Sequence, residues 1–345
     1  MADLIDLVRR TDWYRGSSPR TDGRRLHKEW QHVNVIGDGV EAYVNLNLMD
    51  DQRPAAPTGA TDARTIVITR EPGRGFRGGV RLHDASTIEA RRGRFDLALG
   101  DDVFRIDGDA LHVRAHLPRE RVGVDLRLVP RTAPMLGPNT PLDDGLLHWL
   151  VVPRLDATGT ITVGDRVHHL ERAPAYHDHN WGEFLWGHDL SWEWGFGIPS
   201  DVDNPWSCVF VRFSDRRRTK ASAQGLFIWK DADQHRTFRE DELTITAEGH
   251  LRADRVKKIP PVMGLLAPDR PTDVPARFRI VGQGRGDRVE AVFTSEEVCQ
   301  IVIPTETDLS VTLINEVSGH LHLRGTIRGE PLEIDGAAVF EFLSF

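Results

Sequence analysis

The sequence predicts an all-β protein from three observations: closely spaced turn dipeptides, alternation of apolar and polar residues between them, and a length of 345 residues, enough for two cores. Asp38-Gly39, Asp107-Gly108 and Gly164-Asp165 each separate two runs with strand character. Such dipeptides readily adopt the positive backbone angles of tight hairpin turns. The signal recurs later in the chain, at Glu248-Gly249, at residues 284–287 and at Asp335-Gly336.

Alternation gives the predicted strands one apolar side and one polar side. In residues 44–48 three apolar side chains fall on one face, while Asn45 and Asn47 fall on the other. The polar side could face solvent or a lined cavity, and we expect solvent for the two asparagines. Helix is expected only near the N-terminus, over residues 2–10, where no strong capping signal is found.

The length of the chain and the positions of its turn and proline residues predict two domains, residues 1–198 and 199–345. The net charge of −8 disfavours a nucleic acid or an anionic membrane as partner. We find neither a signal peptide nor an integral membrane segment, and we expect a cytoplasmic protein. Two cysteines are too few for a disulfide framework. Gly73, Gly75 and Gly78 have the G-x-G-x-x-G spacing, but no helix follows, so we expect a loop and no cofactor.

The densest group of chemically active residues is the run Tyr176-His177-Asp178-His179-Asn180-Trp181-Gly182. A structural strand would be mostly apolar here. In an extended chain, alternate residues face opposite ways: Tyr176, Asp178 and Asn180 on one side, His177, His179 and Trp181 on the other. Tryptophans cluster in and after the run, at positions 181, 186, 192, 194 and 206. Their faces suit an apolar or transiently cationic ligand.

This run resembles the signature of the hydroxyneurosporene synthase (carotenoid 1,2-hydratase) and AttH-like family. Weaker similarities are Glu29-Trp30, the hairpin from Trp149 to Leu170, and the closing pattern of residues 325–329, Gly336 and Glu341. The resemblance implies two tandem lipocalin-like antiparallel β-barrels. Ala175 and Gln31 depart from it, because members often have a glycine and a second aromatic residue there.

In hydratase-like relatives the matching aspartate and tyrosine take part in acid chemistry with a histidine on an upstream strand. The resemblance therefore implies catalytic roles for Asp178 and Tyr176, and we assign the histidine to His148. An aspartate in open water is ionised at neutral pH, so the acid role requires burial, and a structural hydrogen-bond acceptor is the alternative. We expect the substrate contacts to be Trp149, His179, Asn180, Trp181, Trp186 and Trp194.

Three functions stay open, all with an apolar, isoprenoid or polyketide-like small molecule. The first is a hydratase or cyclase in which Asp178 protonates an alkene. The second is a pericyclase, because lipocalin-like families of this architecture include Diels–Alderases that hold a polyene in reactive geometry. The third is a non-enzymatic carrier. The sequence does not indicate the oligomeric state.

A metal site is a separate possibility. His177 and His179 could supply imidazoles, joined by nearby candidates: His168, His169, Glu183 and His188. However, His-x-His is common on strands and the resemblance implies no metal, so we expect none.

Overall fold

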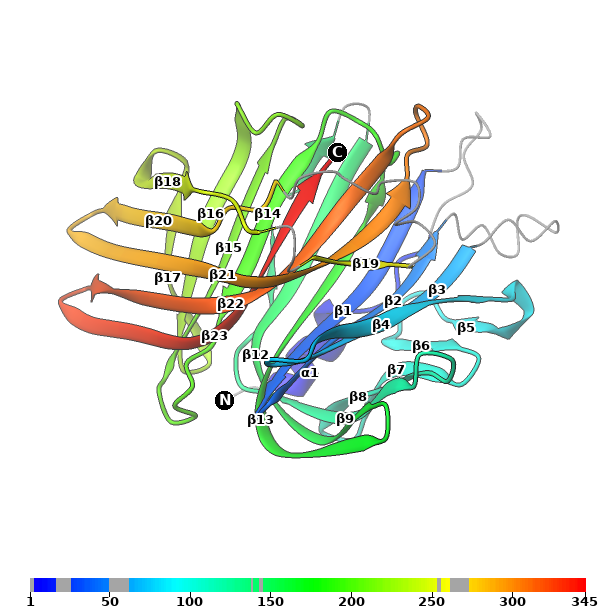
Figure 1. Ribbon diagram of the computed structural model, residues 1–345. Coiled ribbons are helices and arrows are strands. Elements are labelled where there is room, and N and C mark those ends of the chain that lie inside the picture. Colours follow the sequence, from blue (N-terminus) through cyan, green and yellow to red (C-terminus); the bar gives the residue numbers. More distant parts are fainter. Residues whose placement is uncertain are drawn as a thin grey trace. The chain divides into compact units, whose positions relative to one another are not determined.

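The computed structural model describes residues 3–16, 26–49, 62–137, 139–142, 145–252, 256–260 and 273–345. These residues form two mainly antiparallel sheets (Figure 1). Contacts within the chain divide it into two compact units, Met1–Leu185 and Trp186–Phe345, and each unit is described by itself. The domain boundary after residue 198 stays a prediction.

The first unit contains one helix, one 3₁₀ turn and the strands of the first sheet. They are α1 (Leu4–Thr11), β1 (His27–Gly37), β2 (Val40–Met49), β3 (Asp62–Glu71), β4 (Gly75–His83), η1 (Ala85–Thr87), β5 (Ile88–Ala90), β6 (Asp96–Leu99), β7 (Asp102–Asp107), β8 (Ala110–Leu117), β9 (Val122–Pro130), β10 (Met135–Leu136), β11 (Thr140–Leu142), β12 (Gly145–Val163) and β13 (Arg166–Glu183). The described strands run in the order β4-β3-β2-β1-β13-β12-β9-β8-β7-β6-β5, and β10 and β11 pair with β12. Because β3 and β4 also contact β8, the sheet curls around its own core.

The second unit also consists mainly of antiparallel strands in one sheet. Its elements are β14 (Ser191–Gly197), β15 (Trp206–Ser214), β16 (Ala221–Lys230), β17 (Asp233–Arg239), η2 (Glu240–Glu242), β18 (Leu243–Glu248), β19 (Val256–Ile259), β20 (Arg277–Gly284), β21 (Asp287–Pro304), β22 (Val311–Ile327) and β23 (Glu330–Ser344). The described strands run in the order β17-β16-β15-β14-β23-β22-β21-β20-β18, with β19 parallel to β21. β17 contacts β20, so this sheet also curls. The predicted all-β class is confirmed.

Most of the predicted turns hold. Asp38-Gly39 and Gly164-Asp165 connect paired strands as expected, and Arg285-Gly286 joins β20 to β21. The turn after β7 is Gly108-Asp109, one residue later than predicted. The G-x-G-x-x-G segment lies at the hairpin between β3 and β4, where no helix opens.

Two predicted turns were wrong. Glu248-Gly249 ends β18, whose partner is the more distant β20, so no tight hairpin forms there. Asp335-Gly336 lies inside β23, and the hairpin turn is Arg328-Gly329, with φ angles of +52° and +79°. A Cβ at Gly336 would lie 2.8 Å from Ser200 Oγ. This glycine therefore makes room for a neighbouring segment.

The core of the first unit follows the predicted alternation. Val44, Leu46 and Leu48 lie in its hydrophobic cluster together with Ile5 and Val8 of α1. Asn45 is half-buried and Asn47 is only 5% exposed, so the expectation of solvent exposure was wrong. α1 also has a cap that the sequence reading missed, because the Asp3 side chain accepts a hydrogen bond from the Ile5 backbone N. Across the described ranges, no helix has the length and apolar character needed to span a membrane.

Candidate functional site

The two faces of β13 divide the sequence signature. β13 lies between β1 and β12, and cross-strand partners share a face. The outer face carries Tyr176, Asp178 and Asn180, opposite residues of β1 that include His32. The inner face carries His177, His179 and Trp181, on the side of the core residues Val33, Leu150 and Val152. The predicted alternation within the signature is therefore observed.

Asp178 is the centre of a buried hydrogen-bonded group on the outer face. Its exposed fraction is 3%, and that of Tyr176 is 0%. The Tyr176 hydroxyl donates to Asp178 Oδ2 at 2.9 Å, and the Asn180 amide donates to Asp178 Oδ1 at 2.7 Å. Asp178 thus meets the condition of burial that an acid role requires, and both of its oxygens accept hydrogen bonds.

His32 of β1 lies directly across from Asp178 in the strand register. Burial, together with the nearby His177, lowers the pKa of His32 from 6.5 to about 3, against an interaction with the Asn34 side chain that raises it. At neutral pH its imidazole is therefore uncharged. Sequence reasoning missed His32 because its place opposite Asp178 depends on the pairing of strands distant in the sequence.

The outer face continues onto β2 and β3. Tyr43 Oη donates to Glu41 Oε2 at 2.7 Å, and Arg70 donates to Glu41 Oε1, also at 2.7 Å. Trp149 of β12 is on this same face, opposite Asn180, and is 5% exposed. The signature residues therefore belong to a larger polar surface with an aromatic side chain at its border.

His148 is not brought together with Tyr176 and Asp178. It pairs with Trp181 and so lies on the inner-face side of the sheet, whereas Val151 is the residue of β12 opposite Asp178. Its ring stacks on Trp181 with centroids 5.3 Å apart, and its Nδ1 lies 2.7 Å from Asn139 Oδ1. The odd spacing from Val151 turns the side chain to the wrong face for the role assigned to it.

Trp181 takes part in a stack of aromatic and cationic groups. The guanidinium of Arg15 lies 4.4 Å from the centroid of the Trp181 ring and 3.5 Å from that of Trp13. With His148 also stacked on Trp181, the four side chains tie the segment after α1 to the signature strand. The substrate contact expected of Trp181 stays a prediction.

The inner-face histidines form a chain of buried ionisable groups with Asp12. His177 Nε2 lies 2.7 Å from Asp12 Oδ2, and His179 Nδ1 lies 2.7 Å from Asp12 Oδ1. His179 Nε2 then lies 2.9 Å from Glu29 Oε1, and His177 Nδ1 lies 2.8 Å from the carbonyl oxygen of His32. All four ring nitrogens have protein partners, which explains both histidines without a metal.

Attraction between opposite charges stabilises this group of Asp12, His179 and Glu29 despite its burial. Burial by itself would lower the pKa of His179, but Asp12 and Glu29 raise it to about 9. For Glu29, burial acts to raise the pKa, but His179 and His27 lower it to about 2. Asp12 is affected in the same way, and its pKa lies well below its ordinary value. A protonated imidazole between two carboxylates follows at neutral pH.

The second unit holds the remaining predicted substrate contacts. Trp186 lies 6.0 Å from Trp192 between ring centroids, and Trp194 lies 5.9 Å from Phe196. Both Trp186 and Trp194 are 6% exposed. Their contact with substrate stays a prediction.

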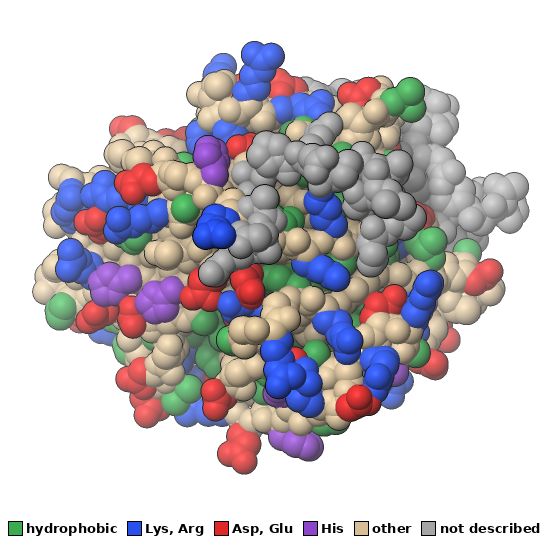
Figure 2. Space-filling view, viewed as in Figure 1, with side chains coloured by type: hydrophobic (Ala, Val, Ile, Leu, Met, Phe, Trp, Pro, Cys, Tyr) green, Lys and Arg blue, Asp and Glu red, His purple; other side chains and the backbone are tan. Residues whose placement is uncertain are grey.

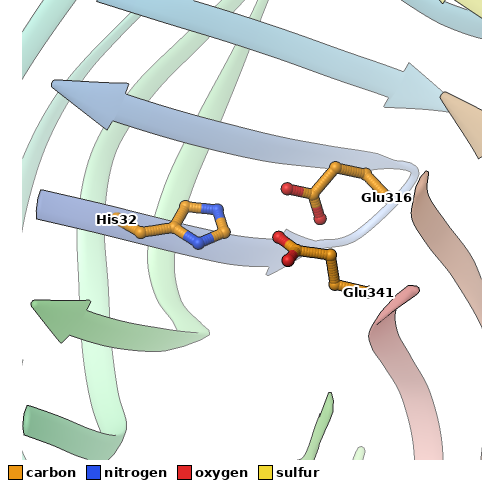
Figure 3. A group of neighbouring side chains, drawn as sticks. All are labelled: His32, Glu316 and Glu341. Carbon is orange, nitrogen blue, oxygen red and sulfur yellow. The ribbon is translucent and has the colours of Figure 1, made fainter. Parts of the chain in front are cut away.

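A pair of carboxyl groups in the second unit was not predicted. Glu316 of β22 and Glu341 of β23 are direct cross-strand partners, and Figure 3 shows their carboxyl groups turned toward one another. Burial raises the pKa of the Glu341 carboxyl, against hydrogen bonds with Trp192 and Glu316 that lower it. Glu341 appeared only in the weak closing pattern, and no sequence signal connected it to Glu316.

Solved structures share this fold. The structure of a protein from Nitrosomonas europaea that is assigned as an AttH matches with a TM-score of 0.61 at 15% identity, over 95% of this chain and 96% of that chain. Kievitone hydratase from Nectria haematococca gives 0.57 at 12% identity, over 92% and 89%. CghA, solved with Sch210972, gives 0.54 at 9% identity, over 93% and 89%.

No family model matches the chain, and no curated protein matches it. At identities of 9% to 15%, the similarity to solved structures concerns the fold. The fold implied by the resemblance is therefore confirmed: the chain has the AttH-like arrangement of tandem lipocalin-like sheets.

Proposed function

We propose that this protein is a small-molecule biosynthetic enzyme that hydrates or cyclises an apolar, isoprenoid or polyketide-like substrate, with Asp178 as the acid. The observation that carries this proposal is the buried group of Tyr176, Asp178 and Asn180, with an uncharged His32 opposite. The fold shared with a kievitone hydratase supports it.

The chemistry balances with these side chains. The carboxylic proton of Asp178 adds to one alkene carbon, and the positive charge develops on the other carbon. Water attacks that carbon, and the proton released from the resulting oxonium returns to the Asp178 carboxylate, directly or through His32. The net change is addition of one water. Attack by a second alkene of the same molecule closes a ring and moves the positive charge to another carbon, and loss of a neighbouring proton to the Asp178 carboxylate then gives a neutral cyclised product. The face of Trp149, on the same side of the sheet, can stabilise the cation.

The proton on Asp178 has to be accommodated by Tyr176. In the observed geometry the tyrosine hydroxyl donates to the carboxyl group. A hydroxyl can also accept a hydrogen bond, so rotation of its O–H allows a protonated Asp178 to donate to Tyr176. We therefore assign Tyr176 as the partner that keeps the acid oriented in both protonation states.

The same geometry favours a pericyclase as the second candidate. Hydrogen bonds from Tyr176 and Asn180 hold both oxygens of Asp178 in place. A carboxyl group fixed in this way can make one polar contact with a polyene substrate while the surrounding side chains hold the polyene in its reactive geometry. CghA, solved with Sch210972, shares the fold. In this case no proton is transferred to carbon.

The test uses purified full-length protein with two substrate sets: acyclic isoprenoids with trisubstituted alkenes, and linear polyenes carrying a diene and a dienophile. Products are analysed by mass spectrometry after reaction in D₂O. Acid catalysis inserts one carbon-bound deuterium per turnover, whereas a pericyclic reaction inserts none. Asp178→Asn should lower turnover by about 10²–10⁴-fold, the range typical of general acid catalysis.

Tyr176→Phe should lower turnover less than Asp178→Asn, since the acid itself remains. Asp109→Asn, at an exposed surface ion pair with Arg127, is the matched control and should leave turnover unchanged. Unlabelled product would replace the acid mechanism by the pericyclic one. Ligand binding without turnover of either set would favour the carrier.

A further inference from the structure

The exposed face of the β22–β23 hairpin carries two histidines and an aspartate that the proposed function does not use. His320 and His322 are two residues apart on β22, so their side chains share a face. Asp335 of β23 is the direct cross-strand partner of His322. Figure 2 shows histidine side chains beside acidic ones over the outer end of these two strands.

The three side chains converge on one carboxylate oxygen. Asp335 Oδ1 lies 3.1 Å from His322 Nδ1 and 3.6 Å from His320 Nε2. The side chains are 58%, 39% and 48% exposed for Asp335, His322 and His320, respectively. They can therefore rotate without disturbing the core. The cross-strand partner of His320 is Ala337, whose small side chain leaves space beside the imidazole.

We propose that His320, His322 and Asp335 form a surface site for a divalent transition metal ion such as Zn²⁺, Ni²⁺ or Cu²⁺. Imidazole nitrogen with carboxylate oxygen is a donor set that these ions accept, whereas Mg²⁺ and Ca²⁺ prefer oxygen donors. Two ligands come from one strand and one from its hydrogen-bonded neighbour, so the backbone does not need to rearrange on binding. Water molecules complete the coordination.

The surrounding charges do not oppose a cation. Arg324, the next residue on this face of β22, has Glu290 and Glu333 as its two cross-strand partners. Its positive charge is therefore flanked by two negative ones. Asp335 adds a further negative charge next to the imidazoles.

The test is calorimetric titration of full-length protein with ZnSO₄ and, separately, NiSO₄. We expect wild-type protein to bind one ion at this site, with affinity falling as the pH drops and protons compete for the imidazoles. The double variant His320→Gln and His322→Gln should weaken binding at this site at least tenfold. Asp335→Asn should weaken it by less, because two imidazoles remain.

The matched control is His112→Gln, which removes a single histidine that lies 2.9 Å from Asp125 Oδ1 on the first unit. This exposed pair offers one imidazole and one carboxylate, so its loss should not change the titration. Retention of wild-type zinc and nickel affinity in the double variant would overturn the proposal. An equal loss in His112→Gln would do the same, since binding would then follow the number of surface histidines.

Discussion

The two faces of β13 are built from the same seven-residue signature but differ in their chemistry. On the inner face, His177 and His179 bind Asp12 in a chain of charged, buried groups. On the outer face, Tyr176 and Asn180 hold Asp178 beside an uncharged His32. The inner groups connect the segment after α1 to the sheet, while the outer group places the Asp178 carboxyl opposite an uncharged imidazole.

This difference teaches that a motif rich in polar residues can serve two purposes at once. The inner groups are mutually satisfied, so removing one of them leaves a buried charge without its partner. The outer groups are connected by hydrogen bonds of ordinary strength. Substitutions on the inner face should therefore affect mainly stability, and those on the outer face mainly activity.

The largest expected effect comes from Asp12→Ala. It removes the carboxylate shared by His177 and His179 and should reduce the free energy of unfolding by about 3–5 kcal/mol. Urea denaturation followed by tryptophan fluorescence measures the change. Asp109→Ala, at an exposed ion pair, is the control and should unfold like wild type. A loss near 1 kcal/mol for Asp12→Ala would show that the inner chain is not essential to the fold.

The pH dependence of stability gives the second effect. Because the pKa of His179 is raised from 6.5 to about 9, its stabilising contribution is complete below pH 6.5 and is lost as the pH rises through 9. The loss should be on the order of 3 kcal/mol. His179→Gln should be less stable at pH 6.5 and should lack this alkaline decrease. An unchanged alkaline decrease in the variant would assign it to another group.

Below pH 6.5 other groups act in the opposite sense. The pKa of His32 is lowered to about 3, so its contribution is lost as the pH falls from 6.5 through 3. The lowered pKa of Glu29, about 2, adds a loss that begins below its ordinary value of 4.5. Stability should therefore be greatest near pH 6.5.

The predicted effect of Asp178→Asn on stability is smaller. Tyr176 can still donate to the amide oxygen, while the donor Asn180 now meets a second amide. One hydrogen bond is lost, and the free energy of unfolding should fall by about 1 kcal/mol. A loss above about 3 kcal/mol would place Asp178 among the structural residues.

His148→Ala should have the smallest effect. It removes a partly exposed ring that stacks on Trp181 and contacts Asn139, at a cost of about 0.5–1 kcal/mol. Because His148 lies on the opposite face from Asp178, turnover should be unchanged. A turnover loss comparable with that of Asp178→Asn would restore its catalytic assignment.

The sequence predicted features that depend on neighbouring residues. Asp38-Gly39 and Gly164-Asp165 formed the expected turns because the conformation of a two-residue hairpin turn depends on the turn residues themselves. The split of the signature into two faces likewise needed only an extended strand. Asp335-Gly336 was wrongly predicted to be a turn. Gly336 lies within a strand and makes room for Ser200, and a contact between residues so distant in the sequence cannot be recognised from the dipeptide.

The site needed information that no single strand contains. Pairing His32 with Asp178 requires the register of β1 against β13, and placing His148 on the opposite face requires the register of β12. A shift of one residue in either register would exchange the faces. Asp12 was equally hidden, because its burial depends on where α1 packs.

The central claim, that the two faces act separately, is tested most directly by a double-mutant cycle of unfolding free energies with Asp12→Ala and Asp178→Asn. Sites that share no partner have additive effects, so the double variant should equal the sum of the single variants within about 0.5 kcal/mol. A coupling energy above about 1 kcal/mol would contradict the claim, because it would show that the charged chain and the acid group form one network.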